Sequence, residues 1–202
     1  IDVSLYEPLF SILGPQAIEF SQLGAMQVRH GNRSPRTAPR NAYQTADGRW
    51  VATSGGTQQI ADRIFAAVGH PEMKDDPRFS NARARVTHVD EIDEVVGGWI
   101  RTQPLKTVLE RFAEVEAPIA PIYDIAQILV DPHYRARQTI IAVPDPDLGE
   151  VLMQNVVPRL SETPGQIRWT GPSQQGADEE YVYREILGLS PEEARQPEAE
   201  RL

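Results

Sequence analysis

Basic side chains are concentrated in one short stretch of an otherwise acidic chain. The stretch is also rich in Pro, Asn, Ser and Thr, and its basic residues are Arg29, His30, Arg33, Arg36 and Arg40. Guanidinium groups bind phosphates and carboxylates through charge-assisted hydrogen bonds. We therefore expect an anion-binding loop here, with Asn32, Arg36 and Arg40 as candidate binding residues. The alternative is a solvated linker that carries scattered charge.

A second candidate site is the run Ser54-Gly55-Gly56-Thr57, which lies between a predicted strand and a predicted helix. Backbone N–H groups of Gly55 and Gly56 could hold an anion at such a place. A single pair of glycines is also what an ordinary helix start contains, with Thr57 or Ser54 as the cap. The helix start is the favoured interpretation.

Few side chains suit nucleophilic or metal chemistry. The chain has no cysteine, which excludes disulfides, thiolate metal sites and a thiol nucleophile. The histidines are far apart in the sequence, and only Asp131 and His133 form a loose pair, so no metal site is predicted. Asp75, Asp76 and Arg78 are interpreted as a turn with a local Asp–Arg pair.

The composition is that of a globular chain with an acidic balance. The 202 residues, 40% hydrophobic and 24% charged, can bury one core of ordinary size or two small ones. With 20 Lys and Arg against 29 Asp and Glu, the net charge of −9 argues against a nucleic-acid partner. No apolar run approaches the roughly 20 residues needed to span a bilayer, and no signal-peptide pattern is present. We expect a cytoplasmic protein with no membrane partner.

The elements that would position the candidate residues begin with a predicted strand. Ile1, Val3 and Leu5 alternate with polar residues, as in a strand whose sheet partners must come from elsewhere. The apolar stretch from Leu9 to Leu23 predicts a helix interrupted near Gly14 and Pro15. The first residue is Ile rather than Met, so we expect the chain to begin inside a fold.

A β-hairpin and three helices are predicted next. Residues 43–45 and 50–53 flank an Asp47-Gly48 turn, which is a strong hairpin signal. Apolar stripes predict helices over residues 60–68, 92–100 and 105–115. The second of these helices has Thr87 and Asp90 at the spacing of a capping box, and the third opens at Pro104.

The C-terminal part predicts shorter elements. They are a helix over residues 124–130, strands over residues 140–143 and 151–157, a helix over residues 179–187, and a helix start at Ser190-Pro191-Glu192-Glu193.

An ordered set of short motifs across nearly the whole chain resembles the C-terminal half of the family III CoA-transferases, the CaiB/BaiF type. The motifs are Ile1-Asp2-Val3-Ser4-Leu5, His30-Gly31-Asn32-Arg33 with Ala38-Pro39, Thr45-Ala46-Asp47-Gly48-Arg49-Trp50-Val51-Ala52, Asp75-Asp76-Pro77-Arg78-Phe79, Ala117-Pro118-Ile119-Ala120-Pro121, Asp131-Pro132-His133 with Ala136-Arg137, Leu148-Gly149 and Ile186-Leu187-Gly188-Leu189-Ser190.

The resemblance implies an α/β fold overall, in which a Rossmann-like large domain is built from both ends of the full chain. Residues 1–23 would be the last strand and helix of the first part of that domain, and residues 24–41 a linker loop. Residues 42–121 would form a small α+β domain, and residues 122–202 would return to the large domain. The resemblance also implies a homodimer of interlocked, ring-shaped subunits.

The chemistry that the resemblance implies is transfer of coenzyme A between carboxylic acids through an aspartyl intermediate. Acyl-CoA and a small carboxylic acid would be the substrates, and no metal would take part. The nucleophilic Asp would lie upstream of Ile1, so no residue here is assigned a catalytic role and this chain alone is expected to be inactive. The expected substrate contacts are Asn32, Arg36, Arg40, Gly55 and Gly56.

Two other functions stay open at this stage. In the related α-methylacyl-CoA racemases a Glu stands where this sequence has Thr57, and a Thr cannot transfer protons near neutral pH. That difference counts against a racemase or epimerase fragment. The other alternative is a non-catalytic module that binds CoA or assembles with a separate catalytic chain.

Overall fold

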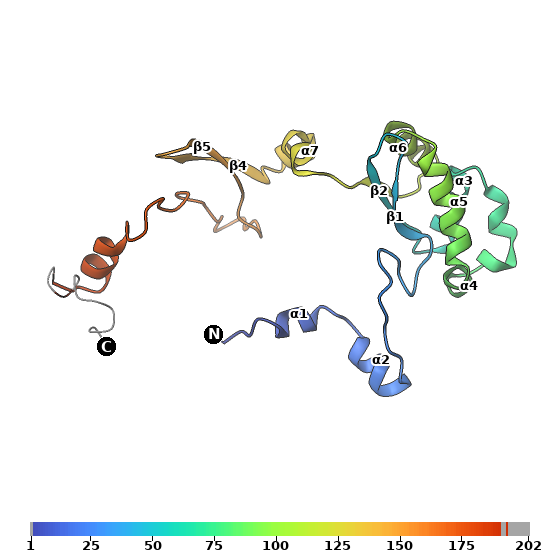
Figure 1. The fold of residues 1–202 in the computed structure, drawn as a ribbon, viewed down its shortest axis with the longest axis horizontal. Helices are drawn as coiled ribbons and strands as arrows, with labels where there is room; N and C mark the ends of the chain where they lie inside the picture. The colour runs from blue at the N-terminus through green and yellow to red at the C-terminus, as the bar shows by residue number, and fades with distance from the viewer. Residues whose placement is uncertain (1, 191–192, 194–202) are drawn as a thin grey trace. The chain divides into compact units, whose positions relative to one another are not determined.

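The computed structural model describes residues 2–190 and residue 193 (Figure 1). The architecture is mixed α/β. The chain divides into two compact units, residues 1–122 and residues 123–202. The elements of the first unit are α1 (Glu7–Ser11), α2 (Gln16–Leu23), β1 (Arg40–Gln44), β2 (Trp50–Ser54), α3 (Gln58–Ala67), two 3₁₀ turns (Pro71–Asp75 and Pro77–Phe79), α4 (Ala82–Thr87), α5 (Val89–Arg101), α6 (Leu105–Glu114) and β3 (Ile119–Pro121).

A three-stranded antiparallel sheet in the order β1-β2-β3 organises the first unit. The predicted hairpin is confirmed: Tyr43 pairs with Val51 across it, and Gly48 adopts the positive φ of +74° that its turn requires. Alternate residues of each strand face opposite sides of the sheet. Tyr43, Val51 and Thr53 are buried, whereas Ala52 and Ser54, which alternate with the buried residues of β2, are exposed.

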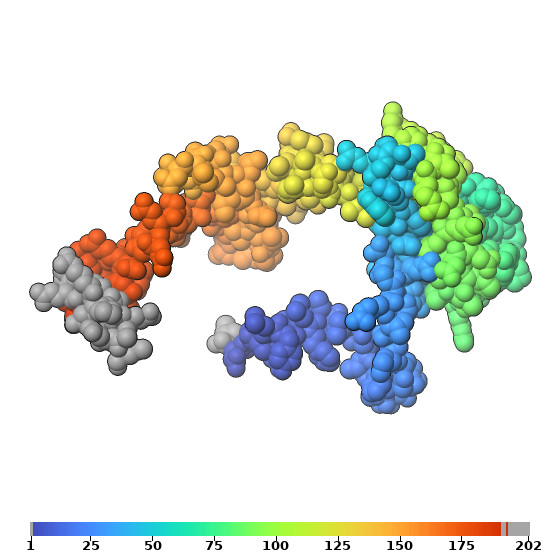
Figure 2. Space-filling view, viewed as in Figure 1, coloured from blue at the N-terminus to red at the C-terminus, as the bar shows by residue number. Residues whose placement is uncertain are grey.

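One face of the sheet is covered by helices. Figure 1 shows α3, α4, α5 and α6 together on one side of β1 and β2, and the same helices form a continuous teal-to-green surface in Figure 2. The apolar stripes predicted for three helices are confirmed, because their residues supply most of the core. The buried core consists of Ala38, Tyr43, Val51, Ala61, Ile64, Phe65, Ala67, Val68, Met73, Phe79, Ile92, Val96, Ile100, Val108, Phe112 and Ala117.

The predicted strand at the N-terminus is not formed within the described residues, and its pairing with strands outside them stays a prediction. Residues 2–4 have no regular secondary structure, and α1 begins at Glu7. A strand exists only where its N–H and C=O groups pair with a neighbour, and no described segment pairs with residues 2–5. The predicted break in the following helix is confirmed, since α1 and α2 are separated near Gly14, whose φ is +70°.

The predicted capping box of α5 is wrong. Thr87 is the last residue of the separate helix α4, and its hydroxyl donates to the carbonyl of Arg83 at 3.1 Å. α5 begins after His88 without a side-chain cap. Helix α4 was not predicted because its sequence, Ala-Arg-Ala-Arg-Val-Thr, has no apolar stripe. Strand β3 was not predicted either, because its three residues are too few to show an alternating pattern.

The second unit contains short elements: α7 (Ile125–Val130), α8 (Pro132–Ala136), the antiparallel hairpin of β4 (Ile140–Asp145) and β5 (Gly149–Gln154), and a π-helix (Tyr181–Ile186). The predicted helix, the two predicted strands and the final helix are confirmed with shifted bounds, and α8 was not predicted. The predicted helix start at Ser190-Pro191-Glu192-Glu193 lies largely outside the described residues. Ser190 and Glu193 exchange the two hydrogen bonds of a capping box.

Candidate functional site

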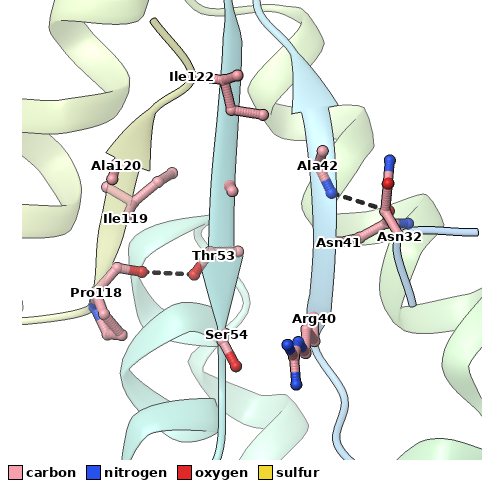
Figure 3. Close-up of a pocket in the computed structure, with 11 residues that line it drawn as sticks. Asn32, Arg40, Asn41, Ala42, Thr53, Ser54, Pro118, Ile119, Ala120 and Ile122 are labelled. Atoms are coloured by element: carbon pink, nitrogen blue, oxygen red, sulfur yellow. Dashed lines mark hydrogen bonds between the residues drawn. The ribbon is translucent and has the colours of Figure 1, made fainter. Parts of the chain in front are cut away.

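The open face of the sheet in the first unit carries a groove with a volume of about 610 Å³ (Figure 3). Its floor is a row of three alanines in register across the strands, because Ala42 pairs with Ala52 and Ala52 pairs with Ala120. A methyl group is the smallest side chain that a strand can present without using glycine. Three methyl groups side by side therefore leave a shallow, apolar hollow over the sheet.

Larger and more polar residues surround this floor. Ile119 and Ile122 lie on the β3 side, and Asn32 lies beyond the free edge of β1 (Figure 3). Arg40 and Ser54 face each other in the register at the end of β1 and β2. The groove thus has an apolar middle and a polar, cationic end, and its volume falls in the range of small-molecule sites.

Arg40 is the cation of the groove. Its side chain is exposed, and no acidic side chain in the described part of the chain forms a salt bridge with it. A guanidinium without a carboxylate partner keeps its full capacity to bind an anionic ligand. The arrangement can hold an elongated molecule that is apolar along its length and carries negative charge at one end.

The basic loop of residues 29–40, which supplies Asn32 to the groove, is hydrogen-bonded to a largely buried carboxylate on α5. Asp93 on α5, whose side chain is 10% exposed, accepts from Arg33 Nε at 2.6 Å, Asn41 Nδ2 at 2.9 Å and Tyr43 Oη at 2.6 Å. Burial, followed by the hydrogen bond to Asp93, raises the pKa of Tyr43 far above its usual value. Arg33 also donates to Asp90 at 2.7 Å, and that bond raises the pKa of Arg33.

A buried arginine holds the other end of the same loop. Arg85 on α4 is 1% exposed and donates through Nε to the carbonyl of Ala38 at 2.6 Å. Its guanidinium also donates to the side-chain oxygen of Gln58. The side-chain Nε2 of Gln58 donates in turn to Asp62 at 2.8 Å. Burial lowers the pKa of Arg85. The loop therefore enters β1 through a fixed, hydrogen-bonded corner.

Comparisons with known proteins identify the family. The model of CoA-transferase family III matches residues 1–179. The chain belongs to this family.

The relatives of this family III chain are CoA-transferases by name. The chain is 38% identical, over all of its residues and 50% of the relative, to a succinyl-CoA–D-citramalate CoA-transferase of Chloroflexus aurantiacus. It is 31% identical to a formyl-CoA:oxalate CoA-transferase of Streptomyces coelicolor, over 83% of this chain and 41% of the relative. The chain spans about half the length of the curated relatives it matches.

The fold is that of a solved family member. A CaiB/BaiF family protein from Brucella suis superimposes with a TM-score of 0.71, at 24% sequence identity, over 93% of this chain and 47% of that one. This agreement supports the mixed α/β architecture of the family III chain.

The five predicted contact residues of this family III chain do not all meet. The groove brings together Asn32 and Arg40. Arg36 lies elsewhere, in a hollow of about 350 Å³ beside α4, and it forms a salt bridge with Glu19. Gly55 and Gly56 are not among the lining residues of the groove.

The residues of the Ser54–Thr57 run pack against the loop before β1 and start α3. The Gly55 N–H donates to the Pro39 carbonyl at 2.6 Å, and a Cβ at Gly55 would lie 2.9 Å from Pro39 Cδ. Thr57 is the N-cap of α3 and accepts from the Ile60 N–H at 3.3 Å. The favoured interpretation of this run, a capped helix start, is confirmed for Thr57.

Sequence reasoning missed Asp93, Arg85 and the alanine floor. Asp93 lies four residues before Gly97 on the same face of α5, and this pair of residues could have suggested a polar pocket for a neighbouring side chain. The alanines gave no signal because only strand register brings them together. The interpretation of Asp76 and Arg78 as a local pair is confirmed by their salt bridge at 2.7 Å.

The described residues contain no cluster of three or more His, Asp or Glu side chains that could hold a metal ion. Within the same residues, no helix combines the length and apolar character needed to cross a membrane.

Proposed function

We propose that this chain is part of an enzyme that moves coenzyme A between carboxylic acids, and that the groove over the alanine floor binds part of the acyl-CoA substrate. The observation that carries the proposal is the placement of Arg40, without an acidic partner among the described residues, at one end of an apolar groove in a family III chain. The other predicted contacts, Arg36, Gly55 and Gly56, remain predictions because they lie outside this groove.

The chemistry of the groove suits an acyl-CoA. The methyl groups of Ala42, Ala52 and Ala120 can contact the apolar part of the pantetheine arm or the acyl chain. Arg40 can bind a phosphate or the free carboxylate of a dicarboxylic acyl group, and Asn32 can supply an amide hydrogen bond. The groove is too open to enclose a ligand alone, so the rest of the site would come from other polypeptide.

Succinyl-CoA is the acyl donor that we propose to test first. Two of the most similar relatives, both from Chloroflexus aurantiacus, carry succinyl-CoA in their names, with D-citramalate and L-malate as the respective partners. Citramalate, malate and succinate are all dicarboxylic acids, so one guanidinium could bind the carboxylate that does not react.

The catalytic step that we propose uses a carboxylate from outside this chain. An Asp would attack the thioester carbonyl and release the CoA thiolate, leaving a mixed anhydride. The thiolate would return to the aspartyl carbonyl and release the donor acid, leaving an aspartyl thioester. The acceptor acid would attack this thioester, release the CoA thiolate again and form a second mixed anhydride. Attack of the thiolate on the acceptor carbonyl of that anhydride would give the new acyl-CoA and free the Asp carboxylate. The residues of this chain would bind and orient CoA during these steps.

Apolar side chains that are exposed in this chain support the proposal that further polypeptide covers them. Exposed large apolar side chains occur on α1, α2, β5 and the π-helix, among them Leu9, Phe10, Ile18, Phe20, Leu152 and Ile186. Exposed apolar surface of this extent marks an interface. We propose that residues 1–23 and 122–202 pack into a Rossmann-like large domain, with residues 42–121 as the small domain, and that the parent protein is an interlocked homodimer.

The first experiment measures binding of coenzyme A and succinyl-CoA to the full-length parent by calorimetry, because the proposed site includes polypeptide outside this chain. Arg40→Ala should weaken binding about tenfold or more, since a charge-assisted hydrogen bond contributes roughly 1.5–3 kcal/mol. Arg101→Ala is the matched control, because Arg101 is an exposed arginine at the end of α5 and does not line the groove. Equal affinities for wild type and Arg40→Ala would refute the groove as the binding site.

The second experiment measures activity. The full-length parent should exchange labelled CoA between succinyl-CoA and a dicarboxylic acid, and the 202-residue chain alone should not. Turnover by the isolated chain would refute a nucleophile outside it. Proton exchange at the acyl α-carbon would instead support a racemase, against which the capping role of the Thr57 side chain counts.

A further inference from the structure

Asp93 does not line the groove, yet it collects more donors than any residue that does. Its two oxygens accept from three side chains, Arg33, Asn41 and Tyr43, at 2.6 to 2.9 Å. A carboxylate that is 10% exposed has lost most of its contact with water, and these donors supply the hydrogen bonds that water would otherwise make. The three donors come from the loop and from β1, so Asp93 joins both segments to α5.

The loop contact is the one that bears on ligand binding. The Arg33 N–H donates to the His30 carbonyl at 3.2 Å, which closes a turn over residues 30–33. Gly31 in that turn has a φ of +62°, a value that glycine adopts without strain. Asn32 is therefore held between Gly31, which shapes the turn, and Arg33, which is anchored on Asp93.

The neighbouring contact fixes the edge of the groove. Asn41 donates its amide to Asp93 and accepts the N–H of Ala42 at 2.9 Å (Figure 3). This amide therefore bridges α5 and the strand that carries the first alanine of the floor. Both residues that border the groove on the β1 side, Asn32 and Asn41, depend on the same carboxylate.

We propose that Asp93 is a positioning residue for ligand binding: by holding the guanidinium of Arg33 it places the Asn32 side chain at the rim of the groove. This inference rests on the proposed function of the groove. Asp90, the other carboxylate that Arg33 contacts, is 88% exposed, and a contact in such an exposed position stabilises little. The positioning role therefore belongs to Asp93.

The experiment is a double-mutant cycle on the full-length parent, whose site is complete under the proposed function, with coenzyme A as the probe. Asn32→Ala and Asp93→Asn should each weaken binding about fivefold to tenfold. In the Asn32→Ala background, Asp93→Asn should cost clearly less than it does in the wild type, because one of the two groove-bordering side chains that it holds is gone and only Asn41 remains. Independent, multiplicative losses would overturn the proposal.

Two controls separate positioning from a general loss of stability. Tyr43→Phe removes one donor from the same carboxylate but leaves Arg33 bound, so it should lower stability without changing the affinity for coenzyme A. Asp90→Asn should leave both nearly unchanged. If the loss of affinity for coenzyme A is proportional to the loss of folding stability across Asp93→Asn, Tyr43→Phe and Asp90→Asn, the role of Asp93 is merely structural and the proposal is overturned.

A readout without ligand tests the anchor itself. Asp93→Asn should speed tryptic cleavage after Arg29, Arg33 and Arg36 by about tenfold, since the loop opens locally when its anchor is lost; unchanged cleavage would overturn the proposal. Should Asp93→Asn not fold, Arg33→Gln breaks the same contact from the loop side. If Arg40→Ala and Asn32→Ala both leave binding intact, the groove function fails; if they weaken binding and Asp93→Asn does not, only the positioning role fails.

Discussion

The side chain of Tyr43 packs against two residues of α5, Asp93 and Gly97, which lie one helical turn apart. Its hydroxyl donates to Asp93, and its ring lies against Gly97 on the same helix. A Cβ built on Gly97 would lie 2.9 Å from Tyr43 Cδ1. Glycine inside a helix normally lowers stability, so its presence at position 97 is explained by this close approach.

The residue-scale prediction concerns that approach. Gly97→Ala should lower the free energy of unfolding by about 1–3 kcal/mol, because the ring of Tyr43 must shift away from α5. Gly98→Ala is the matched control, since nothing lies within 4 Å of a Cβ at that position, and it should be neutral or stabilise by up to about 1 kcal/mol. Urea denaturation measures both. Equal effects of the two substitutions would contradict the packing argument.

At the scale of the secondary-structure element, Thr57 caps a helix and Thr87 does not, although both lie near predicted helix starts. Thr57 accepts the Ile60 N–H and caps α3, whereas the Thr87 hydroxyl donates back to the Arg83 carbonyl and caps nothing. Thr57→Ala should lower the free energy of unfolding by about 1 kcal/mol. Thr87→Ala should change it by less than about 0.5 kcal/mol, as measured by thermal unfolding. The reverse order would restore the capping box predicted for α5.

A hairpin turn also determines how α6 starts. Asp47 accepts from the Leu105 N–H at 3.1 Å, so the β1–β2 turn satisfies the first N–H of a helix nearly sixty residues later in the chain. The hydrogen bond from Thr45, followed by the one from Leu105, lowers the pKa of Asp47 below its ordinary value of 3.8. The carboxylate form is the one that these donors favour.

The lowered pKa of Asp47 in this turn predicts that folding stability depends on pH. A lowered pKa in the folded state contributes stability above the unfolded value, and the contribution is lost as the pH falls through the folded value. Wild type should therefore be more stable than Asp47→Asn at pH 7, and the difference should shrink as the pH falls below about 4. Urea titrations at several pH values measure this, with the exposed Asp75→Asn as control. A difference that is constant with pH would contradict it.

The two units differ in how much apolar surface each buries. Of the buried hydrophobic side chains in the described residues, Val143 is the one that belongs to the second unit, and the others lie between Ala38 and Ala117. Burial of apolar surface is the main favourable term in folding. The first unit therefore has its own core, and the second has little.

The prediction for the whole molecule follows from this contrast. In the 202-residue chain, backbone amides of β1, β2, α3 and α5 should exchange with deuterium much more slowly than those of β4, β5 and the π-helix. In the full-length parent, protection of the second unit should rise, because further polypeptide would cover its apolar side chains. Equal protection in the two units of the isolated chain would contradict this view.

Local sequence patterns were sufficient for the elements that carry their own signal. The Asp47-Gly48 turn, the stripes of α3, α5 and α6 and the break at Gly14 could be predicted because each depends on residues close in sequence. The basic loop was recognised for the same reason, since residues 29–40 are contiguous. The motifs also pointed to the family, because their order survives in the linear sequence.

The tertiary structure alone decided the site. Strand register brings Ala42, Ala52 and Ala120 into one floor, and chain packing lets Asp93 hold Arg33 from sixty residues away. It also divided the predicted loop, placing Arg40 on the groove and Arg36 against Glu19. The physical reason is that pairing and burial act between residues distant in sequence, so residue type and spacing alone cannot assign their partners.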